Sequence, residues 1–199
     1  RVPDIPAGLD AVATFAMGML LVFRTNRAYE RWWEARIHWG ALVNVSRNLA
    51  VKIRELVHPD EAERKVVYRL IVANCYALMD HLRDDFKMDT ISDLLEDDTM
   101  PKHEPSYVAR KIYAQLDAWV KSGRITEQML WVLDREVRTL LDVCGACERI
   151  KKTLMAQSWR AFTRQTIFVY LLVLPWGLFD NFQYWTIPLT IIISYFVIG

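Results

Sequence analysis

Residues 23–50 read FRTNRAYERWWEARIHWGALVNVSRNLA and follow directly on an apolar run. The stretch holds three Trp, five Arg and two Glu. Basic residues at the end of an apolar helix are typical of a membrane boundary on its cytoplasmic side. Tryptophan is amphipathic, so there it suits either the headgroup zone or a large contact between helices. The stretch therefore predicts a helix that leaves a membrane and continues into the cytoplasm.

The composition is too charged for a purely intramembrane protein and too apolar at its two ends for an ordinary soluble one. Of the 199 residues, 53% are apolar and 25% are charged. The net charge of +1 offers no bulk attraction for nucleic acid, and no nucleic-acid-binding motif occurs, so we expect no such partner. The three cysteines are an odd number without framework spacing, which argues against a disulfide scaffold. Both ends of the sequence suggest a fragment of a longer protein.

Two apolar zones predict membrane segments. Residues 7–23 carry one charge and fall slightly short of the roughly 20 residues that span a bilayer. We therefore expect a transmembrane helix over residues 7–23 that continues to about residue 50. Residues 165–199 consist of two uncharged runs separated near Gly177, Asp180 and Asn181, which predicts a transmembrane helical hairpin.

The middle zone, residues 51–164, has the helical period of a soluble helical region. We expect helices over residues 60–83, over 106–121, and from an N-cap at Thr126 to about Ile150. Residues 84–104 are rich in Asp and Glu and end between two prolines, which predicts a loop. This run lacks the glycine and the ligand spacing of a calcium-binding loop, so a solvated loop is favoured over a cation site.

The basic residues predict the orientation. They lie just after the first apolar zone and just before the second, which places the middle zone in the cytoplasm. They are Arg24, Arg27, Arg31, Arg36, Lys151, Lys152, Arg160 and Arg164. The expected fold is an all-α integral membrane protein with a cytoplasmic helical region. Residues 1–199 would form a single unit that crosses the cell membrane several times.

Cys144-Gly-Ala-Cys147 forms a CxxC motif at the end of a predicted helix. A redox motif of this kind normally lies in a βαβ unit, and a zinc site needs four ligands. The four histidines are scattered along the sequence, so we expect a packing role for the cysteines and no metal site. For the following Glu148-Arg149, a solvated helix end is favoured over an ion pair between helices or between subunits.

No catalytic constellation occurs. The sequence contains no G-x-S-x-G, no H-E-x-x-H and no Walker loop, and its seven glycines disfavour phosphate-cradling loops. We therefore expect no catalytic residue, no cofactor and no enzymatic activity.

Phe15, Met19 and Phe23 recur at i, i+4 and i+8 of the first apolar helix and share one face. Several copies of this helix around an axis would line a narrow apolar throat, and apolar constrictions can gate ion flow by dewetting. The spacing alone favours the simpler alternative, a face against lipid or against a neighbouring helix.

The pattern F-R-T-N-x-x-Y-x-R-W-W-E-A-R-x-x-W-G-x-L-V-N-x-S-R over residues 23–47 resembles the signature of the bestrophin family of ion channels in its bacterial form. Further matches are CGACERI at 144–150 and YLLVLPWGL at 170–178, in the same order along the chain. One departure is Thr153-Leu-Met-Ala156, where relatives often have two prolines.

This resemblance implies a pentamer in a lipid bilayer, with helices packed around one central ion pathway. Each subunit would have four transmembrane helices, the first of them upstream of this chain. The resemblance assigns the three apolar side chains of a pore neck to Phe15, Met19 and Phe23. It also implies a cytoplasmic aperture shortly after Gly123-Arg124-Ile125, at Met129, or at Gln128 if the match slips by one residue.

The expected function is therefore an oligomeric channel that passively conducts small monovalent inorganic ions. Chloride is the usual ion of the family, whereas some bacterial members pass cations. Two alternatives remain open. One is a non-conducting membrane scaffold whose cytoplasmic helices bind a partner. The other is a membrane-bound redox enzyme that uses Cys144 and Cys147.

Overall fold

The computed structural model describes residues 7–83, 103–153 and 157–198, and throughout these residues it contains helices and no strand. The expected all-α fold is therefore confirmed. The elements are α1 (Ala7–Lys52), η1 (Ile53–Val57), α2 (Glu61–Arg83), α4 (Glu104–Lys121), α5 (Glu127–Lys152), α6 (Gln157–Phe182), η2 (Gln183–Trp185) and α7 (Thr186–Ile198). The predicted acidic loop falls almost wholly outside the described residues.

The chain divides into two compact units, one of residues 1–32 with 154–199 and one of residues 33–153. Helix α1 contributes to both units. The expectation that residues 1–199 act as a single unit stays a prediction.

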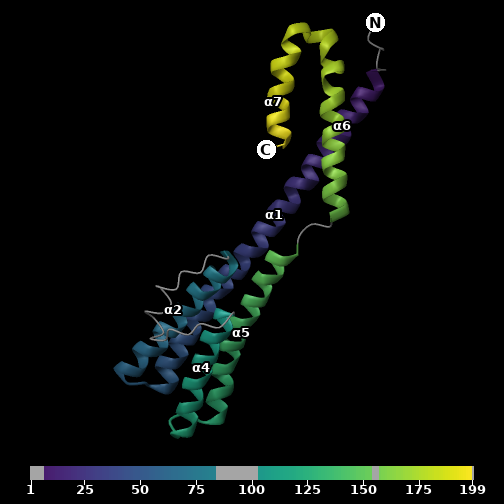
Figure 1. Ribbon diagram of the computed structural model, residues 1–199. Coiled ribbons are helices and arrows are strands. Elements are labelled where there is room, and N and C mark those ends of the chain that lie inside the picture. Colours follow the sequence, from purple (N-terminus) through teal and green to yellow (C-terminus); the bar gives the residue numbers. More distant parts are fainter. Residues whose placement is uncertain (1–6, 84–102, 154–156, 199) are drawn as a thin grey trace. The chain divides into compact units, whose positions relative to one another are not determined.

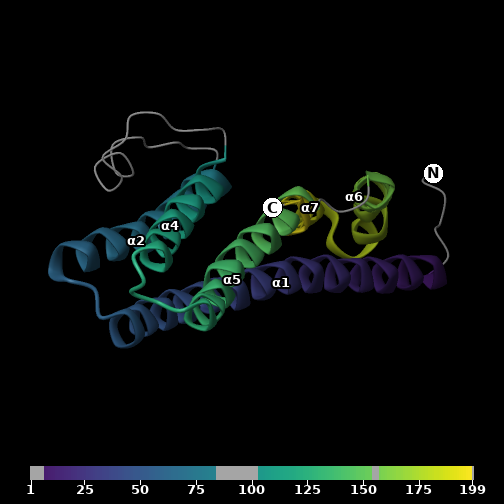
Figure 2. The same cartoon turned by 90° about the horizontal axis from the view of Figure 1, so that it is seen from below.

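The second unit, residues 33–153, is a helical bundle with one apolar core. Helices α2, α4 and α5 lie beside the second half of α1 (Figures 1 and 2). Each helix buries residues at the three- and four-residue spacing that brings side chains to one face. Those fully buried include Leu42, Leu49, Ile53, Val67, Leu78, Val108, Ile112, Leu116, Trp119, Leu133 and Leu140.

Two ion pairs join α5 to α1 in an antiparallel arrangement. Arg149 Nη2 lies 3.1 Å from Glu34 Oε1, and Lys52 Nζ lies 2.5 Å from Glu136 Oε1. The first pair confirms the inter-helix alternative for Arg149. The second is the more enclosed, because the Glu136 side chain is only 10% exposed.

The helix ends follow local chemistry. The Thr126 hydroxyl accepts the Met129 N–H at 3.3 Å, which confirms Thr126 as the N-cap of α5. At the start of α2, Asp60 Oδ1 accepts the Glu63 N–H at 2.8 Å, and Glu63 Oε2 accepts the Asp60 N–H at 3.2 Å. These reciprocal bonds form a capping box, and two orphan donors are thereby satisfied.

Glu63 also connects α2 to the far end of α4. Its Oε1 accepts the Trp119 indole N–H at 3.3 Å, and its Oε2 pairs with Arg124 in the turn between α4 and α5. Gly123 in this turn has a φ of +71°, a left-handed conformation that glycine adopts without steric cost. The Glu63 carboxylate therefore joins the start of α2, the end of α4 and the turn that leads into α5.

The first unit contains the predicted hairpin, but the break lies further along the chain than expected. Helix α6 runs through Pro175 and Gly177 to Phe182, and the turn is the short 3₁₀ segment Gln183–Trp185. The prediction of a break at residues 177–181 was wrong by a few residues. The chain reverses where Gln183 adopts a φ of +47°.

Among the described helices, one segment, Ser158–Phe179, is long and apolar enough to cross a bilayer by length and composition. Gln183–Val197 is also apolar but shorter. The expected three membrane helices therefore stay a prediction.

Candidate functional site

The first half of α1 carries an exposed apolar stripe, defined here as Val12, Phe15, Met19, Val22 and Phe23. Phe15 is 70% exposed, Met19 45% and Phe23 48%. At 100° per residue, these positions fall within about a quarter to a third of the helix circumference. The three residues predicted to form a neck therefore share a face that makes few contacts within one copy of the chain.

The other side of this helix segment packs within its own unit. Met17 is only 4% exposed, and together with Ala13 and Ala16 it borders a cavity of about 360 Å³ against α6. The remaining lining residues come from α6 and include Phe162, Val169, Tyr170, Val173 and Leu174. Packing against α6 thus fixes which face of α1 is left exposed.

Four arginines line a second cavity of the same unit, about 440 Å³ in volume. Arg24 and Arg31 come from α1, and Arg160 and Arg164 from α6, with Trp159 beside them. Arg24 also donates to the Val197 carbonyl oxygen at 3.2 Å, near the carboxyl end of α7. A cation at that end of a helix is favourable. The sequence identified these arginines as boundary markers but did not indicate that they gather around one cavity.

Met129, the predicted aperture residue, lies in the first turn of α5. Its side chain is half-buried and packs against the bundle core, whereas the neighbouring Gln128 is exposed. Gly123-Arg124-Ile125 forms the preceding turn, in which Ile125 is buried. Met129 is thus less accessible within one copy of the chain than the three stripe residues on α1.

The two cysteines of the CxxC motif are buried in the bundle core, as the packing interpretation expects, and neither forms a disulfide. Burial and the neighbouring Glu148 carboxylate raise the pKa of the Cys144 thiol to about 12. Burial also raises the pKa of Cys147. Reactive cysteines instead have lowered pKa values, so this environment disfavours the redox alternative.

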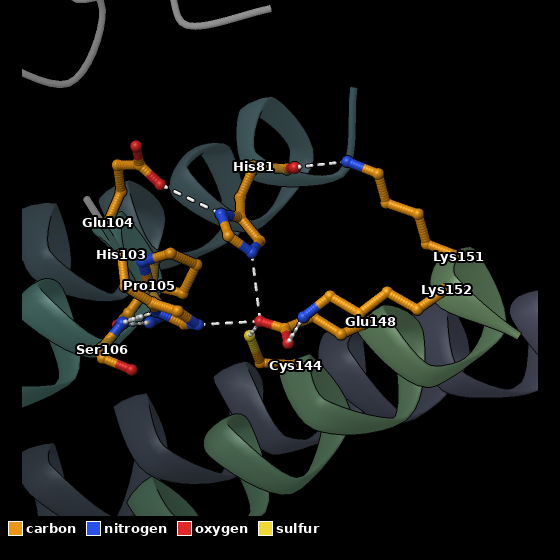
Figure 3. Close-up of polar contacts among 10 residues, drawn as sticks. His81, His103, Glu104, Pro105, Ser106, Cys144, Glu148, Lys151 and Lys152 are labelled. Atoms are coloured by element: carbon orange, nitrogen blue, oxygen red, sulfur yellow. Dashed lines mark hydrogen bonds and ion pairs between the residues drawn. The ribbon is translucent and has the colours of Figure 1, made fainter. Parts of the chain in front are cut away.

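The structure brings together two histidines that the sequence left scattered. His81 lies in the last turn of α2, His103 caps the start of α4, and Glu148 lies near the end of α5 (Figure 3). Glu148 Oε1 lies 3.1 Å from His81 Nε2 and 2.7 Å from His103 Nε2. The two imidazole rings are 4.7 Å apart between centroids. We call these three residues the His–Glu cluster.

Further groups surround the His–Glu cluster. His81 Nδ1 lies 3.2 Å from Glu104 Oε2, and Lys152 Nζ donates to Glu148 Oε2 at 3.0 Å. Partial burial disfavours the Glu148 carboxylate, but hydrogen bonds from Lys152 and His103 outweigh it and lower the pKa of Glu148 to about 2. Glu148 is therefore ionised at neutral pH.

Comparisons with known proteins agree with the resemblance. Residues 3–199 match the family model described as bacterial/fungal bestrophin protein. A voltage-dependent anion channel-forming protein of Synechocystis sp. is 33% identical over 98% of this chain and 67% of its own length. A protein of the same description from Nostoc sp. is 30% identical over 96% of this chain and 65% of its own length. The chain thus spans about two thirds of the length of these curated relatives.

Solved structures share the fold. Two point mutants of a bacterial bestrophin homologue from Klebsiella pneumoniae superpose with TM-scores of 0.88 and 0.85, at 20% and 19% identity. The matches cover 98% and 97% of this chain and 76% and 72% of the solved chains. The family match covers nearly the whole sequence and supports a channel protein rather than an enzyme. The chain therefore belongs to the bacterial and fungal bestrophins and is a helical membrane protein.

Proposed function

We propose that this chain forms most of one subunit of an oligomeric ion channel that passively conducts small monovalent ions. The observation that carries the proposal is the apolar stripe on α1, which remains exposed although the opposite side of the helix is packed. Family membership and relatives named as anion channel-forming proteins support it. In an assembled channel, copies of the stripe would face one another across a shared axis.

The neck in this proposal consists of Phe15, Met19 and Phe23 from each subunit. Phe15 and Phe23 are eight positions apart, so at a rise of about 1.5 Å per residue the neck would be roughly 12 Å long. The bestrophin resemblance favours five subunits. Rings of apolar side chains hold water weakly, so the neck would conduct when wetted and close by dewetting. The driving force is the electrochemical gradient alone.

An apolar ring does not choose the sign of the ion, so we assign selection to charged groups elsewhere. The cavity lined by Arg24, Arg31, Arg160 and Arg164 concentrates positive charge in the unit that carries the stripe. Clustered positive charge raises the local concentration of anions. We therefore favour chloride and similar anions as the permeant ions, in agreement with the names of the curated relatives.

We also propose a multi-pass arrangement in the cell membrane, a bacterial inner membrane. Helices α6 and α7 and the first part of α1 would cross the bilayer, and the bundle of residues 33–153 would lie in the cytoplasm. The apolar segment Ser158–Phe179 and the basic residues near its start support this orientation. Met129 is the proposed second constriction, with the exposed Gln128 as the alternative.

The test compares Phe23→Ala with Phe168→Ala in the full-length protein, reconstituted into planar bilayers. Phe168 on α6 is 66% exposed but lies outside the stripe, so it matches the side chain that is removed. We expect Phe23→Ala to change single-channel conductance or gating and Phe168→Ala to leave both unchanged. The reversal potential in asymmetric potassium chloride gives the sign of the permeant ion.

Two outcomes would contradict the proposal. If both variants carry the same currents as the wild type, Phe23 does not line the neck. Bilayers that contain folded protein but carry no current would instead favour the scaffold alternative, in which the helical body binds a partner and no ion permeates. A reversal potential at the potassium equilibrium potential would mean that the channel passes cations. That result would overturn the anion assignment but not the proposal of a channel.

A further inference from the structure

The His–Glu cluster joins three helices that are distant in sequence. His81 belongs to α2, His103 precedes α4, and Glu148 belongs to α5, and all three side chains point toward one another in Figure 3. Each of the three is half-buried. The cluster lies entirely within the helical bundle of residues 33–153 and shares no residue with the proposed neck.

Two of the three spacings between the potential ligand atoms are close to those of a tetrahedral metal site. One atom from each residue lies within 4.8 Å of the other two. In a tetrahedral zinc site with bonds of about 2.1 Å, ligand atoms are roughly 3.4 Å apart. The Glu148 oxygen lies 3.1 Å from the His81 nitrogen and 2.7 Å from the His103 nitrogen. A shift of the Glu148 carboxylate by roughly half an ångström would therefore open the site to a metal ion.

The hydrogen bond on the far side of His81 prepares this residue as a ligand. Glu104 Oε2 lies 3.2 Å from Nδ1 and Glu148 Oε1 lies 3.1 Å from Nε2, so a neutral ring can donate to only one of the two carboxylates. In the tautomer with the proton on Nδ1, the Nε2 lone pair points at Glu148 Oε1, an acceptor. Two acceptors 3.1 Å apart need a cation between them, either a second proton on the ring or a metal ion. Carboxylate–histidine–zinc triads have this arrangement.

His103 needs a change of tautomer. Its Nδ1 accepts the Ser106 N–H at 3.3 Å, so the proton of the neutral ring lies on Nε2. Metal binding at Nε2 moves that proton to Nδ1 and releases the Ser106 N–H. Because this capping contact is exposed, water can replace it. Metal binding therefore costs one weak hydrogen bond at the start of α4.

The two carboxylates of the site offset the two nearby ammonium groups, so no net positive charge opposes a dication. With neutral histidines, the carboxylates of Glu104 and Glu148 face the Lys152 ammonium, which is 3.0 Å from Glu148 Oε2. Lys151 Nζ, the second of these ammonium groups, donates to the His81 carbonyl oxygen at 3.1 Å. A metal at Glu148 Oε1 leaves the contact between Oε2 and Lys152 in place.

We propose that the His–Glu cluster is a zinc-binding site, with His81 Nε2, His103 Nε2 and Glu148 Oε1 as protein ligands and water as the fourth. Two imidazoles and one carboxylate are a ligand set that suits zinc. Glu104 acts as the outer partner that orients His81. The metal would tie the end of α2 and the start of α4 to α5, and it would stabilise the bundle increasingly as free zinc rises above its dissociation constant.

The experiment uses the full-length protein without an affinity tag, stripped with a chelator and titrated with zinc sulfate in detergent. Bound metal is measured by elemental analysis and affinity by competition with a chromophoric chelator. We expect one zinc per subunit and a thermal midpoint that rises with zinc. His103→Gln should weaken binding more than Glu104→Gln, for which loss of an outer partner predicts about 10- to 100-fold.

The matched control is His38→Gln, which removes another half-buried histidine near a carboxylate, 4.0 Å from Glu34. This variant should bind zinc like the wild type. Because 42% of the His103 side chain is exposed, its variant should fold, as checked by circular dichroism. Folded His103→Gln and His81→Gln that keep wild-type affinity would overturn the proposal, as would wild-type protein that binds no zinc.

Discussion

Replacement of Lys52 by Met is expected to destabilise the bundle far more than the loss of an ordinary ion pair. Methionine keeps most of the length of the aliphatic stem but removes the ammonium that is 2.5 Å from Glu136 Oε1. The Glu136 side chain is 10% exposed, so its carboxylate stays in the protein without a partner. Removal of one member of a buried pair costs about 3–5 kcal/mol. Because the Lys52 side chain is 31% exposed and water can reach the site, we expect about 3 kcal/mol.

The partner variants should behave differently. In Glu136→Leu, Lys52 can turn its ammonium into water, so the expected cost is about 1 kcal/mol. The double variant removes both charges and should lie within about 1 kcal/mol of the wild type, because apolar replacements of buried pairs are often neutral. The non-additivity is then about 3–5 kcal/mol.

Denaturant titration of the full-length protein in mild detergent, followed by far-UV circular dichroism, measures these differences. Lys65→Met is the control, because the side chains of Lys65 and Glu61 are 67% and 70% exposed. Exposed pairs of this spacing contribute about 0.3–0.5 kcal/mol. The reasoning fails if Lys52→Met costs no more than Lys65→Met, or if the two single variants simply add in the double variant.

The raised pKa values of Tyr113 and Cys144 give two further predictions. Burial and the hydrogen bond to Asp134 raise the pKa of Tyr113 from 10.0 to about 12, so its contribution to stability is complete below pH 10 and is lost as the pH rises toward 12. In ultraviolet difference spectra, Asp134→Asn should shift one late-titrating tyrosine to lower pH, and an unchanged curve would contradict this. With its pKa raised from 9.0 to about 12, Cys144 should react with Ellman's reagent at pH 8 about a thousandfold more slowly than in the denatured chain. Fast reaction of Cys144 in the native protein, mapped by mass spectrometry, would restore the redox alternative.

Local signals in the sequence predicted the helices well. The period of apolar residues gave the three helices of the middle zone, and the hydroxyl of Thr126 gave the start of α5. The hairpin break was misplaced because glycine and asparagine weaken a helix only slightly, and α6 continues through Gly177. The π-helical turn after Lys52 has no equally simple signal in the sequence.

The His–Glu cluster could not be predicted because its members meet only when three helix ends converge. His81 and His103 lie on either side of the predicted acidic loop, and no spacing rule brings their rings within 4.7 Å. The apolar stripe is the opposite case. Its residues belong to one helix, so the 3.6-residue period was sufficient to place Phe15, Met19 and Phe23 on one face.

The contacts of Glu63 restrict which amino acid can occupy that position. Its two oxygens receive the Asp60 amide, the Trp119 indole and the Arg124 guanidinium, so every partner is a donor. Glutamine would turn an NH₂ group toward some of these donors, and aspartate is one methylene too short to span them. Related sequences should therefore keep glutamate at this position unless the residues that donate to it change at the same time.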